Sequence, residues 1–225
     1  MLEDRPRTGS SGLSIVLAAA ALLATACAGP RPVPVDATSA AARLATGQFI
    51  TPDAVGRALI QPLNPGLRRY PNFVAGEAVK SQLSPDGRTL AVLCAGMNSL
   101  VDADGKVDEA HSTQYIFLYD VAGENRLRPA LRQVIPQPNA YVGMAFAPDG
   151  SALYVAGGSD DAVYVYARPL RAWALAAKIE LGHGDKGIGI DVRPNAGGLG
   201  LSADGRTLVV ANNYNDSVSV IDTET

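Results

Sequence analysis

Two histidines, His111 and His183, limit the chemistry that the side chains of this chain could perform. A multi-histidine metal site has too few ligands, and the G-x-S-x-G pattern of a nucleophile elbow does not occur. His183 stands between two glycines, a setting typical of a loop residue that makes hydrogen bonds. The sequence therefore predicts no catalytic, cofactor-binding or metal-binding residues, and no cofactor.

The run Gly182–Gly187 has the G-x-G-x-x-G form of a dinucleotide-binding loop. That loop works only where a helix begins and points its N-terminus at the pyrophosphate. Here Ile188–Pro194 follows, and then Gly197 and Gly198, which disfavours such a helix. We interpret the run as a flexible connecting loop.

An acidic run, Asp102–Glu109, resembles a calcium loop in composition. An EF-hand needs Gly at its sixth position and a bidentate acid at its twelfth. Counted from Asp102, those positions hold Val107 and Thr113. The run is better interpreted as a solvated hairpin insertion.

The elements that would position these residues repeat along the chain. Ser84–Val92, Ala147–Val155 and Ser202–Val210 align with Asp-Gly at the same place in each. Because Gly accepts a positive φ and Asp tolerates tight turns, each copy predicts a strand, a turn and a second strand. The copies lie farther apart than the roughly 40 to 45 residues of a compact blade, which indicates insertions within the repeats.

Further strands are expected after each pair, from alternating apolar and polar residues. Third strands are expected at 115–119, 162–166 and 217–221, and fourth strands at 130–135 and 175–181. Four antiparallel strands per repeat make a β-propeller blade, whereas a β-sandwich, the alternative, has no reason to repeat a whole unit. We expect an all-β fold, an incomplete β-propeller with about three blades. Second strands such as Leu208–Ala211 are apolar on both faces, so neighbouring blades should cover both.

The last copy resembles the repeat of the YVTN family of β-propellers. Asn212, Asn213 and the run Ser217–Thr223 match its Asn-rich turn and its Val-Ser-Val-Ile-Asp-Thr strand. The copy at Tyr154–Tyr166 matches less well, and the first copy departs most because an insertion follows Asn98. The resemblance covers about Glu77 to the end and implies a propeller.

A second resemblance concerns Thr46–Pro52 and Gln61–Leu67, which are similar to the front of bacterial proteins in which such a propeller precedes an alkaline-phosphatase-superfamily phosphoesterase. No residues of a phosphoesterase half occur in this chain. Closed propellers have four to eight blades, so we expect the natural protein to continue beyond Thr225. Assembly of several chains into one ring is the alternative.

The amino terminus has the pattern of an export signal. Arg5 and Arg7 precede an apolar run at 13–23, which is too short to span a membrane comfortably, and Ala24-Thr25-Ala26 follows. Cleavage there could release a soluble protein, or Cys27 could become the lipidated first residue of an imperfect lipobox. We favour lipidation at Cys27.

Three segments follow from this pattern: a signal peptide at 1–26, a Pro/Ala-rich tether at 27–46 and a partial propeller at 47–225. Within the tether, Asp36–Ala45 is expected to be a short helix or disordered. We expect a periplasmic or cell-envelope location. With Cys27 acylated or removed, Cys94 is the only thiol left; it lies in an apolar strand, so we expect it in the core.

Composition and charge describe an ordinary soluble surface, with a formal net charge of −3 and 18% charged residues. Because Lys and Arg are scattered, no nucleic-acid partner is expected. We predict an exported, non-catalytic platform that binds an unknown protein or small-molecule ligand, with membrane attachment through lipidated Cys27. The alternative is an enzyme of the propeller lactonase type, with Asn98, Asp160 and Asn213 contributing to a site at the central channel.

Overall fold

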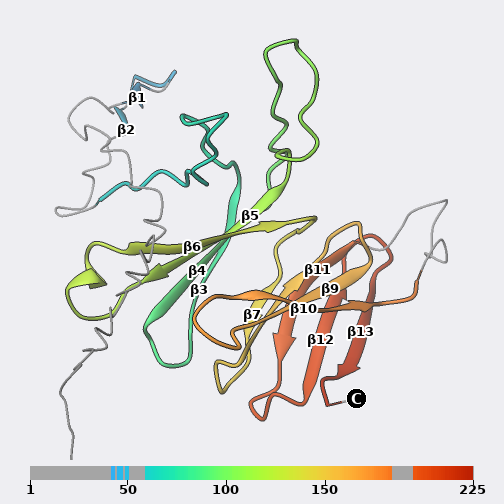
Figure 1. Cartoon of the computed structure of the whole chain (residues 1–225). Helices are drawn as coiled ribbons and strands as arrows, with labels where there is room; N and C mark the ends of the chain where they lie inside the picture. The colour runs from blue at the N-terminus through green and yellow to red at the C-terminus, as the bar shows by residue number, and fades with distance from the viewer. Residues whose placement is uncertain (1–41, 44, 48, 51–58, 184–194, 225) are drawn as a thin grey trace, which may run out of the picture.

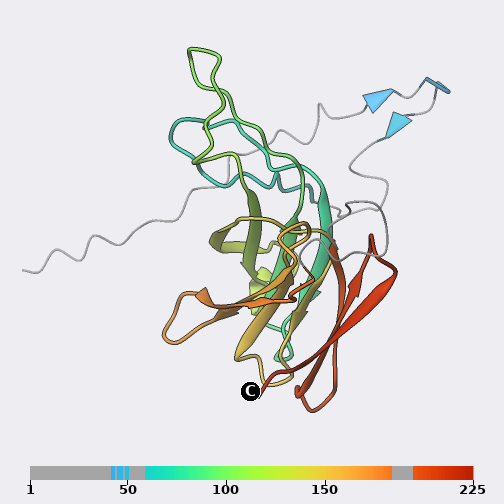
Figure 2. The ribbon, with the colours of Figure 1, turned by 90° about the vertical axis from the view of Figure 1, so that its right-hand side faces the viewer.

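Three antiparallel sheets follow one another along the chain, and each packs against the next (Figures 1 and 2). A computed structural model describes residues 42–43, 45–47, 49–50, 59–183 and 195–224. In each sheet the strands pair in sequence order, so every sheet is a simple meander. The described chain is therefore all-β and has the blades of an incomplete β-propeller.

The strands of the three blades have the following bounds. Blade 1 contains β3 (Ala78–Leu83), β4 (Thr89–Cys94), β5 (Gln114–Asp120) and β6 (Ala130–Gln137); blade 2 contains β7 (Met144–Phe146), β8 (Ala152–Ala156), β9 (Ala162–Ala167) and β10 (Ala174–Glu180); blade 3 contains β11 (Ala196–Leu201), β12 (Thr207–Asn212) and β13 (Ser217–Asp222). The predicted second, third and fourth strands are confirmed. No helix within the described ranges has the length and apolar character that a membrane span requires.

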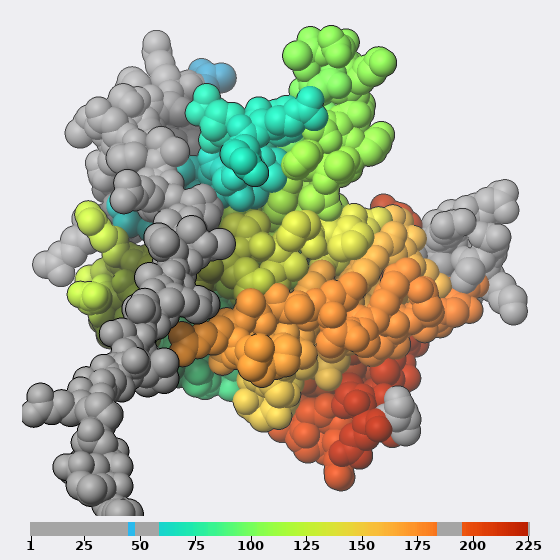
Figure 3. Space-filling model, in the orientation of Figure 1, coloured from blue at the N-terminus to red at the C-terminus, as the bar shows by residue number. Residues whose placement is uncertain are grey.

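Two short strands, β1 (Ala42–Arg43) and β2 (Phe49–Ile50), pair before the first blade. Residues 42–43 belong to the segment for which a short helix was one expectation, and they are extended instead. Between β4 and β5, the predicted insertion stands out from the body of the molecule as a light-green lobe (Figure 3). A bridge between Val101 and Val107 makes it a hairpin, as expected.

The Asp-Gly turns have the predicted geometry in all three blades. Gly87, Gly150 and Gly205 have φ values of 68°, 72° and 78°, which a side chain would oppose. In blade 1, the Asp86 carboxylate accepts hydrogen bonds from the Ser84 hydroxyl at 2.6 Å and from the Arg88 backbone N–H at 3.0 Å. Blade 3 repeats this arrangement, so the turn that joins the first two strands is closed locally by its own side chains.

Apolar contacts between blades form the core. Leu93, Ile116 and Leu118 of blade 1 pack in one cluster with Phe146 and Leu153 of blade 2, and this is the first seam. The second seam packs other residues of blade 2 against blade 3: Tyr154, Ala156 and Val163 lie with Ala196, Leu208 and Val210. Blade 2 is thus covered on both faces.

The outer faces of blades 1 and 3 differ. Phe117 and Cys94 of blade 1 lie in a cluster with Leu63 and Phe73, which come from the segment before β3. On blade 3, by contrast, Val218 and Val220 are 63% and 68% exposed. The expectation that both faces of 208–211 are covered is therefore wrong, because no described segment packs on the outer face of this blade.

Truncation of a seam residue should destabilise the whole chain. Leu153 is fully buried in the first seam, so Leu153→Ala should lower the free energy of unfolding by about 2–5 kcal/mol through lost burial and a residual cavity. Leu170→Ala is the control, because Leu170 is 89% exposed. This variant should change the free energy of unfolding by less than about 0.5 kcal/mol. Urea unfolding measures both, and equal effects would contradict the seam assignment.

The Asp-Gly turns should make stability depend on pH. Serine hydroxyls that donate to Asp86, Asp149 and Asp204 hold the pKa of each carboxyl below its usual value. A lowered folded-state pKa gives stability that is present above the unfolded value of about 3.9 and is lost as pH falls through the folded value. Urea unfolding from about pH 5 to pH 2 should show this loss. The loss of stability should be smaller in Asp204→Asn. An unchanged dependence of the free energy of unfolding on pH in this variant would contradict the mechanism.

Candidate functional site

The three residues predicted for a lactonase-type site lie in the connections between second and third strands, at the upper end of the blades in Figure 1. Asn98 is buried. Its Oδ1 accepts a hydrogen bond from the Gly76 backbone N–H at 2.9 Å, and its Nδ2 donates one to the Thr113 carbonyl at 3.0 Å. Asp160 accepts hydrogen bonds from the Tyr164 hydroxyl and the Asn139 amide. Asn213 is exposed. No described hydrogen bond joins the three to one another.

The acidic run in the insertion is divided between two local arrangements. Asp102 Oδ1 accepts hydrogen bonds from the backbone N–H groups of Asp104 and Lys106, each at 2.9 Å. Asp108 instead accepts from Tyr70 and contacts His111, whose ring lowers the pKa of this carboxyl most. Both residues therefore serve to order the hairpin and its neighbour segment.

Two other residues singled out in the sequence, Cys94 and His183, can also be placed. Cys94 is fully buried, which raises the pKa of its thiol to about 11, so the expected core role is confirmed. His183 lies beside Asp161 of blade 2. The rest of the Gly182–Gly187 run lies outside the described residues, and so does Cys27.

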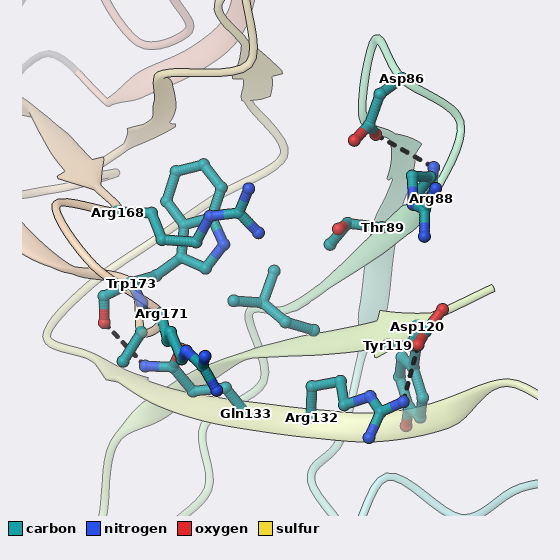
Figure 4. Close-up of a pocket in the computed structure, with 12 residues that line it drawn as sticks. Asp86, Arg88, Thr89, Tyr119, Asp120, Arg132, Gln133, Arg168, Arg171 and Trp173 are labelled. Atoms are coloured by element: carbon teal, nitrogen blue, oxygen red, sulfur yellow. Dashed lines mark hydrogen bonds and ion pairs between the residues drawn. The ribbon is translucent and has the colours of Figure 1, made fainter. Parts of the chain in front are cut away.

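A pocket of about 550 Å³ lies between blades 1 and 2 (Figure 4). Blade 1 contributes residues from the β3–β4 turn, the end of β5 and β6, and blade 2 contributes the β9–β10 turn. The lining residues are Asp86, Arg88, Thr89, Leu118, Tyr119, Asp120, Arg132, Gln133, Arg168, Arg171, Ala172 and Trp173. The site therefore exists only where the two blades pack together.

One wall of the pocket is held by reciprocal hydrogen bonds across the seam. Gln133 Nε2 donates to the Trp173 carbonyl at 2.7 Å, and the Trp173 backbone N–H donates to Gln133 Oε1 at 2.8 Å (Figure 4). The buried Trp173 ring packs edge-on against Phe146, with 5.8 Å between centroids. The guanidinium of Arg168 lies 5.6 Å from the Trp173 ring centroid, within range of a cation–π interaction.

Positive charge predominates in the pocket, because four arginines face two aspartates. Arg132 forms an ion pair with Asp120 at 2.7 Å. Within the described residues, Arg88, Arg168 and Arg171 have no carboxylate within ion-pair distance. The pKa of Asp86 is lowered mainly by Ser84 and also, slightly, by Arg168 of the other blade, so the two blades interact electrostatically here.

This pocket could not be predicted from the sequence. Its arginines come from distant parts of the chain and look scattered until the seam forms. The one local signal is the run Arg168–Trp173, in which two arginines and the single tryptophan occupy one turn. A guanidinium presents a planar fork of donors that matches a carboxylate or a phosphate, so this pocket can bind an anion.

Comparison with known proteins gives structural similarities of low identity. No protein-family model and no curated protein matches the chain. The periplasmic gluconolactonase of Pseudomonas aeruginosa is 22% identical, with a TM-score of 0.41 over 66% of this chain and 54% of that one. A putative 6-phosphogluconolactonase from Bacteroides uniformis is 12% identical, with a TM-score of 0.48 over 80% of this chain and 45% of that one.

A third similar structure is the β-propeller domain of Cps50 (Swd1) from Myceliophteria thermophila, 12% identical, with a TM-score of 0.43 over 64% of this chain and 40% of that one. The chain thus spans about half the length, or less, of these structures. With TM-scores below 0.5, the similarities support no inference about the activity of this chain.

Proposed function

We propose that this chain is a binding platform whose pocket between blades 1 and 2 holds an anionic ligand. The observation that carries the proposal is the convergence of Arg88, Arg168 and Arg171, which lack carboxylate partners among the described residues, on one pocket. Unpaired guanidinium groups that face the same space repel one another, and a bound anion relieves that repulsion. The pocket volume of about 550 Å³ suits a small molecule or a peptide side chain.

The ligand should combine a carboxylate or phosphate with an apolar part. Leu118, Tyr119 and Trp173 line the same space as the arginines, so an apolar group next to the anion would be covered. Bidentate hydrogen bonds from arginine favour planar or tetrahedral oxyanions over halide ions.

The cellular setting is part of the proposal. The signal at 1–26 and lipidation of Cys27 would place the platform on the outer side of a membrane. The turn and strand at 212–223 support a propeller of the YVTN type, and 46–67 supports its place in a larger phosphoesterase; the gene sequence after codon 225 tests the latter. The lactonase alternative stays a second prediction. Its candidate residues Asn98 and Asp160 hydrogen-bond to neighbouring residues, and no described hydrogen bond joins them to each other.

Anion binding should depend on the arginines of the pocket. Isothermal titration of the purified chain with pyrophosphate and with citrate should show saturable binding that weakens as salt rises. Arg168→Gln or Arg171→Gln should each raise Kd at least about tenfold, because a hydrogen bond to a charged group contributes about 1.5–3 kcal/mol. The preferred probe distinguishes a phosphate site from a carboxylate site.

Arg128→Gln is the matched control, since Arg128 is exposed and lies outside the pocket. It should bind both probes like the parent chain. Absence of binding by the parent chain, or an equal loss in Arg128→Gln, would overturn the proposal.

Lipidation gives a separate prediction. Mass spectrometry of the protein from bacterial membranes should find a diacylglyceryl group on Cys27 as the first residue, because the lipobox cysteine is modified before cleavage. Cys27→Ala should move the protein to the soluble fraction. A bare mature terminus, or unchanged fractionation of Cys27→Ala, would refute membrane attachment through this residue.

A further inference from the structure

A serine, a histidine and an aspartate meet at the second seam, away from the arginine pocket. Ser219 is in β13 of blade 3, Asp161 immediately precedes β9 of blade 2, and His183 follows β10. His183 Nδ1 lies 2.7 Å from Asp161 Oδ1, and His183 Nε2 lies 3.3 Å from Ser219 Oγ. The two ring nitrogens thus contact the acid and the hydroxyl in the order that a nucleophile–base–acid relay requires.

The hydrogen bonds around this cluster favour one direction of proton transfer. Asp161 Oδ2 accepts from the His183 backbone N–H at 2.8 Å, which fixes the carboxylate against the ring. With the Nδ1 proton directed at Asp161, Nε2 is left as an acceptor. Asn212 Nδ2 donates to Ser219 Oγ at 2.9 Å, so the Ser219 proton is free to point to His183 Nε2.

The repeats provide an internal comparison. In the strand register, Val92 pairs with Phe117, Val155 with Tyr164 and Val210 with Ser219. The position is aromatic in the first two blades and a serine in the third. The smaller side chain leaves space on this face of blade 3, and the His183 ring occupies it.

The cluster is partly accessible and contains an unsatisfied polar atom. The side chains of His183 and Asp161 are 24% and 13% exposed, and Ser219 is also partly exposed, so the cluster is not sealed from solvent. Asn212 is 2% exposed, and its Oδ1 has no hydrogen-bond partner among the residues that the structure describes. Buried polar atoms are nearly always satisfied, and exceptions are found at functional sites.

We propose that Ser219 and His183 are catalytic residues that hydrolyse small carboxylic esters through an acyl-serine, with Asp161 as a positioning residue. Ser219 Oγ attacks the ester carbonyl carbon while its proton moves to His183 Nε2. The C–O bond to the alcohol then breaks, and the alcohol oxygen takes that proton. Water attacks the acyl-serine, gives a proton to His183 Nε2 and releases the carboxylic acid, after which the proton returns to Ser219.

Asn212 has a supporting part in this reaction. Its Nδ2 donates to Ser219 Oγ and to Ser217 Oγ, so the amide orients the attacking hydroxyl. This activity goes beyond binding and uses a different seam. Failure of either proposal would therefore leave the other unaffected.

The test is reaction of the purified chain with a fluorophosphonate probe, followed by mass spectrometry of the labelled peptide. We expect one adduct, on Ser219, and release of p-nitrophenol from p-nitrophenyl acetate. His183→Gln should slow labelling at least about a hundredfold, and its remaining rate should rise about tenfold per pH unit, as expected when hydroxide replaces the general base.

Asp161→Asn should slow labelling while it leaves the hydroxyl in place, because the tautomer of His183 is no longer fixed. Ser81→Ala is the matched control: Ser81 is an exposed serine on β3 of blade 1, away from the second seam. It should label like the parent chain. Circular dichroism shows which variants are folded. Absence of a Ser219 adduct on the folded parent chain, or an unchanged labelling rate in His183→Gln, would overturn the proposal.

Discussion

The structure depends on the need of each blade to cover its apolar faces with a neighbour. A four-stranded antiparallel sheet with large apolar side chains on both faces cannot be stable in water by itself, and the seams supply the cover. Blade 2 shows this most clearly, because Leu153 and Val155 face blade 1 while Tyr154 and Ala156 face blade 3. Both candidate sites lie at these seams, where side chains from two blades meet.

The repeats share a backbone design but differ in the side chains that matter for chemistry. The Asp-Gly turns hold the same positions in all three blades and close in nearly the same way, so they serve the fold. At the equivalent position the blades carry different residues: Phe117, Tyr164 and Ser219. Only the serine of blade 3 offers a hydroxyl to a neighbouring histidine. A repeat thus gives a constant frame, and departures from the repeat indicate where a particular function has been added.

The frame of the blades could be predicted from the sequence, because local turn and strand patterns specify it. Gly87 and its counterparts require a left-handed backbone, and alternating residues such as those of 162–166 specify strands whichever neighbour they meet. The sites could not be found in the same way. Arg88 and Arg168, or His183 and Ser219, become neighbours only through the packing of one blade on another. The exposed valines of β13 show the same limit, since their pattern indicates an apolar face but not whether anything covers it.

Equilibrium unfolding, followed by two signals, tests most directly whether the seams hold the chain together. Trp173 is the single tryptophan and reports on the first seam, whereas far-ultraviolet circular dichroism reports on strands throughout the chain. If the blades depend on one another for cover, fluorescence and circular dichroism should change together in urea, in one transition with one midpoint. A loss of the Trp173 signal at clearly lower urea, with the strand signal intact, would show that the blades are stable separately and would contradict the account.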